Sequence, residues 1–207
     1  VLLAQTKRAQ VPFRAWLPAA MAAPAPVSAL VHSSTLVTAG VFLLVRCGVL
    51  VRSLKFYISI VGVLTLFVGS FCACGRFDAK KIVAFSTLSH LGYMFVGVSS
   101  GCFLFGFFHL IMHACFKALM FISVGMLIIK NNHSQDFRQI GFSLKNIFYV
   151  WCSLIRAFSL VGVPFFSGFF SKDLMLENFK WGFNVFFKLL FFVSLIFSVF
   201  YRFRLVK

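Results

Sequence analysis

Residues 102–129 read CFLFGFFHLIMHACFKALMFISVGMLII, and this stretch decides the fold class. It carries one formal charge, Lys117, and two histidines, and nearly all of its other residues are apolar. At ~1.5 Å per residue, a helix of this length exceeds the ~30 Å hydrocarbon core of a bilayer. The stretch therefore predicts a transmembrane helix.

The rest of the chain has the composition of a membrane protein. Of its 207 residues, 61% are hydrophobic and 12% are charged, whereas soluble domains average about 45–50% and about 25%. The apolar residues form blocks of helical length without the alternation of barrel strands. Because a bilayer core requires every backbone polar group to be paired internally, we predict an all-α polytopic membrane protein built as a helix bundle.

Six blocks qualify as full spans, and a broken helix at about 1–22 precedes them. Pro12 and Pro18 interrupt that first helix, because proline lacks the N–H donor that a helix needs. We interpret residues 1–207 as a single transmembrane domain and, since the chain does not open with Met, as a fragment of a longer protein. The expected spans are about 26–45, 56–75, 81–100, 102–129, 147–170 and 183–201.

Basic residues flank these blocks and dominate the formal net charge of +16. Lys and Arg at such positions anchor helix ends and set topology. No RNA-binding signature accompanies them, so we expect no nucleic-acid partner. Alternating the gaps between two sides places the more basic side in the cytosol or the mitochondrial matrix. That side is expected to hold Arg76, Lys80, Lys81, Lys130, Arg138, Lys145, Arg202, Arg204 and Lys207.

His109, His113 and Lys117 form the strongest candidate site. Their spacing of four places them on one helix face, over ~12 Å of the axis. An intramembrane lysine is costly and commonly marks an ion path, and histidine titrates near physiological pH. We interpret the row as a proton relay, the alternative being a packing helix whose histidines bond to neighbouring helices. Zinc is disfavoured because neither an HExxH glutamate nor a third ligand accompanies the histidines.

Two further candidates lie near the start of the chain. His32 is a lone polar residue in an uncharged span, and it fits a structural histidine as well as a relay member. Lys7 precedes the break at Pro12, where a discontinuous helix can place charge beside a cavity. An interfacial lysine beside Arg8 explains Lys7 equally well.

A second break is expected at Pro164, near the end of the 147–170 block. Lys172 and Asp173 follow it as a charged pair, an arrangement that resembles a discontinuous helix. Arg156 lies within the same block, and the residues around it assign it no firm role.

The sequence contains no legible cofactor site. Its six cysteines show no pairing with Cys or His at the spacing of zinc or iron–sulfur ligands. Neither GxGxxG nor GxxxxGK[ST] occurs, so no nucleotide site is indicated. We expect no metal, no bound cofactor and no catalytic redox centre in this chain.

Several runs resemble the antiporter-like subunits of NADH:ubiquinone oxidoreductase, respiratory complex I, in the same order and over nearly the whole chain. The HSST and KKIVAFST runs are most similar to the mitochondrial subunit 5 group. The runs are KRAQVPFRAWLPAAMAAPAPVSALVHSSTLVTAG at 7–40, DAKKIVAFSTLSHLGYM at 78–94, FHLIMHACFKALMF at 108–121, QDFRQIG at 135–141 and GVPFFSGFFSKD at 162–173.

This resemblance implies a proton-translocating subunit of the membrane arm, in the mitochondrial inner membrane. The enzyme activity would belong to the whole complex, with FMN, iron–sulfur clusters and ubiquinone chemistry in partner subunits. Other partners would be the membrane-arm subunits and the lipid bilayer, with cardiolipin one candidate lipid.

The resemblance also implies roles for individual residues. Lys7 would serve the first half-channel, and His32 would connect the two halves. His109, His113 and Lys117 would form the central hydrophilic axis, and Lys172 would serve the proton exit.

The alternative function is a subunit of a multi-subunit sodium/proton antiporter, which shares nearly all of these relay residues. A structural scaffold is disfavoured, because it has no need of costly intramembrane charges. The chain departs from the family pattern at His90, where glutamine is common, and at Arg156. It also lacks the family's key glutamate on an earlier helix, because it begins after that position.

Overall fold

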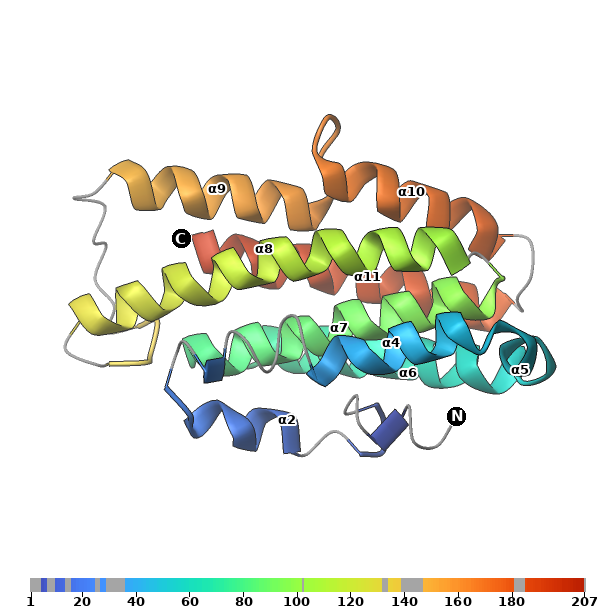
Figure 1. Ribbon diagram of the computed structural model, residues 1–207. Coiled ribbons are helices and arrows are strands. Elements are labelled where there is room, and N and C mark those ends of the chain that lie inside the picture. The colour runs from blue at the N-terminus through green and yellow to red at the C-terminus, as the bar shows by residue number, and fades with distance from the viewer. Residues whose placement is uncertain are drawn as a thin grey trace.

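The computed structural model describes residues 5–6, 10–13, 16–24, 27–28, 36–101, 103–131, 134–138, 147–180 and 185–206. These residues form helices and one isolated β-bridge, with no strand among them. Figure 1 shows the long helices side by side with roughly parallel axes. The predicted all-α bundle is therefore confirmed.

Four long helices make up most of the bundle: α6 (Lys55–Cys74), α7 (Ala79–Ser99), α8 (Phe103–Lys130) and α11 (Val185–Val206). Each is long and apolar enough to cross a membrane. The shorter elements are α2 (Trp16–Ala19), η1 (Ala20–Ala22), α4 (Leu36–Arg46), α5 (Gly48–Ser53), α9 (Ile147–Val161) and α10 (Ser167–Lys180).

The block predicted as one span at 147–170 is two helices. Helix α9 ends at Val161 and α10 begins at Ser167, and the connection between them projects from the upper edge of Figure 1. Gly162, with a φ of 85°, turns the chain, and Pro164 cannot continue a helical hydrogen-bond ladder. The discontinuous helix expected from the sequence is present, with its second half running on to Lys180.

Helix α7 lies at the centre of the bundle and is buried from Ile82 to Ser99. Its hydroxyl side chains hydrogen-bond to carbonyls of the same helix. Ser86 Oγ donates to the Val83 carbonyl at 2.7 Å, and Ser99 Oγ donates to the Val96 carbonyl at 2.8 Å. Such back-bonding lets a Ser- and Thr-containing helix enter an apolar interior without unpaired hydroxyl groups.

Glycines bring α6 and α7 into backbone contact. A Cβ on Gly92 of α7 would lie 2.6 Å from the Leu66 nitrogen and 2.7 Å from the Gly62 oxygen of α6. A Cβ on Gly69 would lie 2.9 Å from the Ser89 nitrogen. Small residues at a helix interface permit this close packing in membranes, where helices associate through van der Waals contact.

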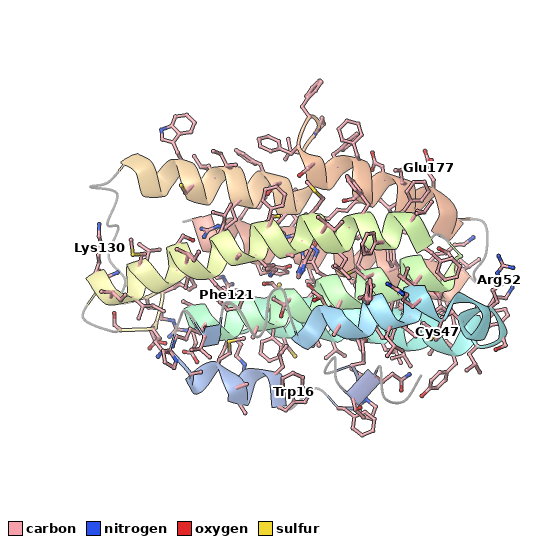
Figure 2. The ribbon with its side chains drawn as sticks, viewed as in Figure 1. Trp16, Cys47, Arg52, Phe121, Lys130 and Glu177 are labelled. Carbon is pink, nitrogen blue, oxygen red and sulfur yellow. The ribbon has the colours of Figure 1, made fainter. Side chains whose placement is uncertain are left out.

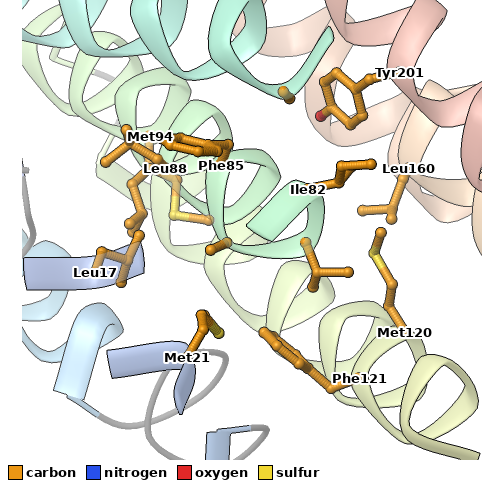
Figure 3. Close-up of a cluster of buried hydrophobic side chains, with 14 of the residues drawn as sticks. Leu17, Met21, Ile82, Phe85, Leu88, Met94, Met120, Phe121, Leu160 and Tyr201 are labelled. Atoms are coloured by element: carbon orange, nitrogen blue, oxygen red, sulfur yellow. The ribbon is translucent and has the colours of Figure 1, made fainter. Parts of the chain in front are cut away.

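An apolar cluster joins the N-terminal segment to the long helices (Figure 3). Large apolar side chains are exposed on the outside of the bundle; Leu104 of α8 and Phe186 of α11 are 82% and 67% exposed. The members labelled in Figure 3 are Leu17, Met21, Ile82, Phe85, Leu88, Met94, Met120, Phe121, Leu160 and Tyr201.

Charged side chains mark the two ends of the bundle. Figure 2 places Arg52 and Glu177 at one end and Lys130 at the other, with Phe121 between them. All three charged residues are exposed. This separation is what a bundle crossing a bilayer requires, because exposed charge is tolerated in the headgroup regions and is costly in the hydrocarbon.

A short loop contact closes the Lys130 end. The Ala79 N–H donates to the Gln135 carbonyl at 2.9 Å, and the Phe137 N–H donates to the Phe77 carbonyl at 3.1 Å. These bonds flank the β-bridge between Asp78 and Asp136. The segment after α8 is thereby fastened to the α6–α7 connection.

Candidate proton-transfer site

One face of α8 carries His109, His113 and Lys117 into the interior, as their spacing predicts. The histidine side chains are 3% exposed and Lys117 is 0% exposed. Residues on the opposite face, including Ile111 and Leu119, point outwards and are exposed. The three nitrogen-bearing side chains therefore face α7 and its neighbours, not lipid.

Lys117 has polar neighbours but no carboxylate partner within the part of the chain that the structure describes. Its ammonium donates to the Ser86 hydroxyl of α7, and its Nζ lies 3.9 Å from the Met120 sulfur. Arg156 of α9 donates to the Met120 carbonyl at 3.3 Å. A fully buried lysine whose partners are neutral is free of the ion pair that would hold its proton in place.

His90 of α7 lies against both histidines of α8. Its Nδ1 is 3.4 Å from His109 Nε2, and its ring centroid is 5.1 Å from that of His113. Neither ring nitrogen of His113 has a hydrogen-bond partner among the described residues. Three imidazoles thus gather on the face that leads to Lys117.

The row continues into α10. His109 Nδ1 lies 2.9 Å from the Ser171 hydroxyl, and Lys172 is the next residue along the helix. The Lys172 ammonium donates to the carbonyls of Leu160 and Val161, which α9 leaves free where it breaks. Cations bind well to the carbonyl end of a helix, so the break itself holds Lys172 in place.

Arg202 of α11 approaches the same imidazoles from another side. Its Nη2 lies 2.9 Å from His90 Nε2, and the side chain is only 4% exposed. The sequence placed Arg202 in a basic flank after the last span. Helix α11 instead continues to Val206, which carries Arg202 into the bundle.

A small cavity of about 20 Å³ adjoins this cluster. That volume is sufficient for about one water molecule, although the surface exposed to the cavity is mostly apolar. The lining residues are Leu66, Ser89, His90, Tyr93, Lys172, Ser194, Leu195, Ser198 and Arg202.

No three His, Cys, Asp or Glu side chains among the described residues are arranged to hold a metal ion. The three imidazoles are close together, but a guanidinium donates to His90 Nε2. That nitrogen lone pair is occupied, and the neighbouring cation disfavours a second positive charge.

The structure therefore brings together His109, His113, Lys117 and Lys172 from the predicted set, and their roles in proton transfer stay predictions. Asp173 is half-buried on α10 and lies outside the hydrogen-bonded row. Lys7 and His32 lie outside the described residues.

Sequence reasoning missed four members of this cluster: His90, Arg202, Ser86 and Ser171. His90 was visible as a polar residue within a predicted span, a sufficient signal for a closer look. Arg202 gave no such signal, because a basic residue that follows an apolar block normally marks the end of a helix.

The family model of the NADH:quinone oxidoreductase/Mrp antiporter transmembrane region matches residues 1–198. The chain belongs to this family. The NADH-ubiquinone oxidoreductase chain 5 of Aedes aegypti is 49% identical over 210 residues, covering all of this chain and 36% of the relative. Chain 5 of Lumbricus terrestris is 48% identical over 181 residues, covering 86% of this chain and 32% of the relative. The chain thus spans about a third of these curated relatives.

Two solved membrane complexes contain chains with the same fold. A chain in the Mrp complex from Dietzia sp. has a TM-score of 0.84 and 30% identity, covering 98% of this chain and 24% of that one. A chain in an archaeal membrane-bound sulfane sulfur reductase has a TM-score of 0.87, covering 98% and 44%, and its 23% identity shows the fold alone.

Proposed function

We propose that this chain is part of subunit 5 of a mitochondrial NADH:ubiquinone oxidoreductase and that it conducts protons within the membrane arm. The observation that carries the proposal is the buried row from Lys117 through His113 and His109 to Lys172. The similarity to NADH-ubiquinone oxidoreductase chain 5 supports the choice of complex.

The chemistry of the row favours protons as the transported species. Lys117, His113 and His109 are nitrogen bases, each able to hold or release a proton. The hydroxyls of Ser86 and Ser171 adjoin the row and can relay a proton between such bases. His109 and Lys117 each reach a hydroxyl at hydrogen-bond distance, whereas His113 has no partner among the described residues, so transfer to and from His113 would need bridging water.

Redox chemistry in other subunits would drive this transfer. We propose that FMN, iron–sulfur clusters and ubiquinone are bound there, and that this chain contributes no reacting centre of its own. A change of charge at one end of the row alters the energy of the next buried cation through Coulomb interaction, which is strong where water is scarce. The inner mitochondrial membrane, other membrane-arm subunits and surrounding lipid, with cardiolipin one candidate, complete the setting.

A sodium/proton antiporter subunit is the second candidate function, and the Mrp structure is the finding that favours it. Two observations count against it. The identity to the chain 5 relatives is 48–49%, compared with 30% for the Mrp chain. The described row also offers ammonium, guanidinium and imidazole groups, whereas hard cations prefer oxygen ligands.

Replacing Lys117 with Met in the full-length chain of the assembled complex tests the proposal. The thioether keeps much of the side-chain volume and removes the proton carrier, so NADH:quinone turnover and proton pumping should both fall ~10-fold or more. Both rates are measured in coupled membranes, after native gels establish that the complex has assembled.

Lys130→Met provides the matched control, because Lys130 ends the same helix and is exposed. We expect it to retain both rates. Normal turnover and pumping in assembled Lys117→Met complex would show that Lys117 is structural, and the proposed path would be wrong.

A further inference from the structure

Arg202 and His90 are not among the residues that the proposed path requires, yet they are buried against it. Arg202 Nη2 lies 2.9 Å from His90 Nε2, and the Arg202 side chain is 4% exposed. Among the described residues, no partner exists for its Nε and Nη1 atoms. Burying a guanidinium is costly unless it is paired or hydrogen-bonded, so the bond to His90 offsets part of that cost.

The contact has a defined direction, because arginine can only donate hydrogen bonds. His90 Nε2 must therefore be the acceptor, and in the neutral ring the proton then sits on Nδ1. That Nδ1–H faces His109 Nε2 at 3.4 Å. His109 Nε2 is consequently an acceptor as well.

The same reasoning extends to α10. Since His109 accepts at Nε2, its proton lies on Nδ1, which is 2.9 Å from the Ser171 hydroxyl. Ser171 in turn donates to the Gly168 carbonyl at 3.3 Å. Every N–H and O–H in this chain of groups points from α11 towards α10, and the first donor is Arg202.

We infer that Arg202 is a positioning residue that fixes the tautomers of His90 and His109, so that His109 presents its Nδ1–H to Ser171 and His90 itself stays neutral and carries no proton along the path. It also occupies the one lone pair through which His90 could take up a proton from the α11 side. The inference rests on the proposed function. It assigns a direction to the hydrogen bonds of His90 and His109. It also makes Arg202 a barrier that keeps protons on the path from escaping into the adjoining cavity.

Two replacements of His90 distinguish this orienting role from proton carrying by His90, from packing and from charge balance. His90→Gln keeps an acceptor for Arg202 and a donor for His109, so the direction is preserved. His90→Glu pairs well with Arg202, yet a carboxylate cannot donate to His109. His109 would then turn its N–H towards position 90, and the direction would reverse.

The measurement is the number of protons pumped per NADH by the assembled complex in liposomes, with the variants in the full-length chain. We expect His90→Gln to stay within about twofold of the wild type and His90→Glu to fall ~10-fold or more. Loss in both variants would make His90 itself the proton carrier and overturn the inference. Retention in both, or in His90→Glu alone, would reduce the contact to packing or charge balance and would also overturn it.

Arg202 supplies an independent pair of variants. Arg202→Lys keeps a donor-only side chain and should rescue most of the pumping that Arg202→Met loses. Pumping unchanged by Arg202→Met would contradict the inference. Where Arg202→Met fails to assemble, the two His90 variants decide the question, because they leave Arg202 in place.

Failure of the inference is distinguishable from failure of the proposed function. If Lys117→Met abolishes pumping while the two His90 variants behave alike, only the orienting role of Arg202 is lost. If Lys117→Met pumps normally, the proton path itself is wrong.

Discussion

Lys117 and Lys172 are both buried cations, and they are held by different kinds of partner. The Lys172 ammonium bonds to backbone carbonyls at the end of α9. These carbonyls are free to accept a hydrogen bond because the helix is broken there. Lys117 bonds to the single hydroxyl of Ser86. A side chain held by one hydroxyl exchanges partners with fewer rearrangements than one held by two carbonyl dipoles, so the Ser86 contact is the one to test at Lys117.

Ser86→Ala tests the Lys117 contact directly. Removing the hydroxyl leaves a buried ammonium without its acceptor, a loss of about 1–3 kcal/mol, and proton pumping should fall several-fold. Ser99→Ala is the matched control on the same helix, because among the described residues the Ser99 hydroxyl bonds only to the Val96 carbonyl of its own helix. Equal pumping by the two variants would mean that the Ser86 hydroxyl does not belong to the path.

At the scale of single residues, sequence spacing correctly predicted which side chains share one face of α8. His109, His113 and Lys117 were placed together because a period of 3.6 residues relates them. His90 and Arg202 could not be placed in this way, since they come from different helices and 112 positions separate them. Contacts between helices depend on packing, and local periodicity carries no information about partners.

At the scale of helices, a long apolar block without proline corresponded to one helix, whereas a long block that contains proline did not. The block at 102–129 corresponds to α8, Phe103–Lys130. The block at 147–170 contained Pro164, and the break followed from the missing N–H donor. Helix α10 nevertheless extends to Lys180 through Asp173 and Glu177, a polar stretch that hydropathy alone assigns to a loop.

Gly92→Ala should destabilise the α6–α7 pair. The added methyl group would lie 2.6 Å from the Leu66 nitrogen and Thr65 Oγ1, and backbone atoms cannot yield as a flexible side chain can. Overpacking of this kind costs about 1–3 kcal/mol. The expected result is a lower midpoint for thermal unfolding of the complex in detergent, recorded by loss of activity on heating.

Gly75→Ala is the control for this substitution. Gly75 is exposed, its φ is −86°, and an added Cβ would meet only the Cys72 oxygen, at 3.9 Å. A midpoint for Gly92→Ala equal to that of Gly75→Ala would show that the two helices are not in the close contact described above.

At the scale of the whole molecule, the bundle is fastened at the Lys130 end by the contact between residues 134–138 and 75–79. The pKa values of two carboxyl groups in this contact, Asp78 and Asp136, are shifted in opposite directions. The pKa of Asp78 is lowered, chiefly by its hydrogen bond and ion pair with Lys81. The pKa of Asp136 is raised, chiefly because it hydrogen-bonds to Asp78 and faces that charge.

These shifts predict how the contact depends on pH. Asp78 adds stability above its unfolded pKa, and that stability is lost as the pH falls through its lowered folded pKa. Asp136 has the reverse effect: its charge weakens the contact once the pH rises through its raised pKa. Asp136→Asn should therefore tighten the contact at neutral pH, because it removes the repulsion and supplies an amide donor to Asp78.

Hydrogen exchange of the Ala79 and Phe137 amides measures this, since both amides donate across the contact. Exchange should be slower in Asp136→Asn than in the wild type at neutral pH, and the difference should shrink in acid, where Asp136 is protonated in both states. Asp78→Asn should exchange faster, because Lys81 loses its partner. Faster exchange in Asp136→Asn would contradict the assigned signs.

The burial of α7 from Ile82 to Ser99 has a consequence for how the protein is made. Its hydroxyl groups are paired within the helix, but its imidazole, His90, finds its partners on α8 and α11, so α7 is less suited than α6 to rest alone among lipid tails as it leaves the ribosome-bound insertion machinery. Helix α6 immediately precedes α7 in the chain, is strongly apolar, and packs against α7 at Gly69 and Gly92. We therefore expect α6 and α7 to enter the bilayer together as a helical hairpin. Helix α7 then packs against α6 before α8 and α11 have been synthesised.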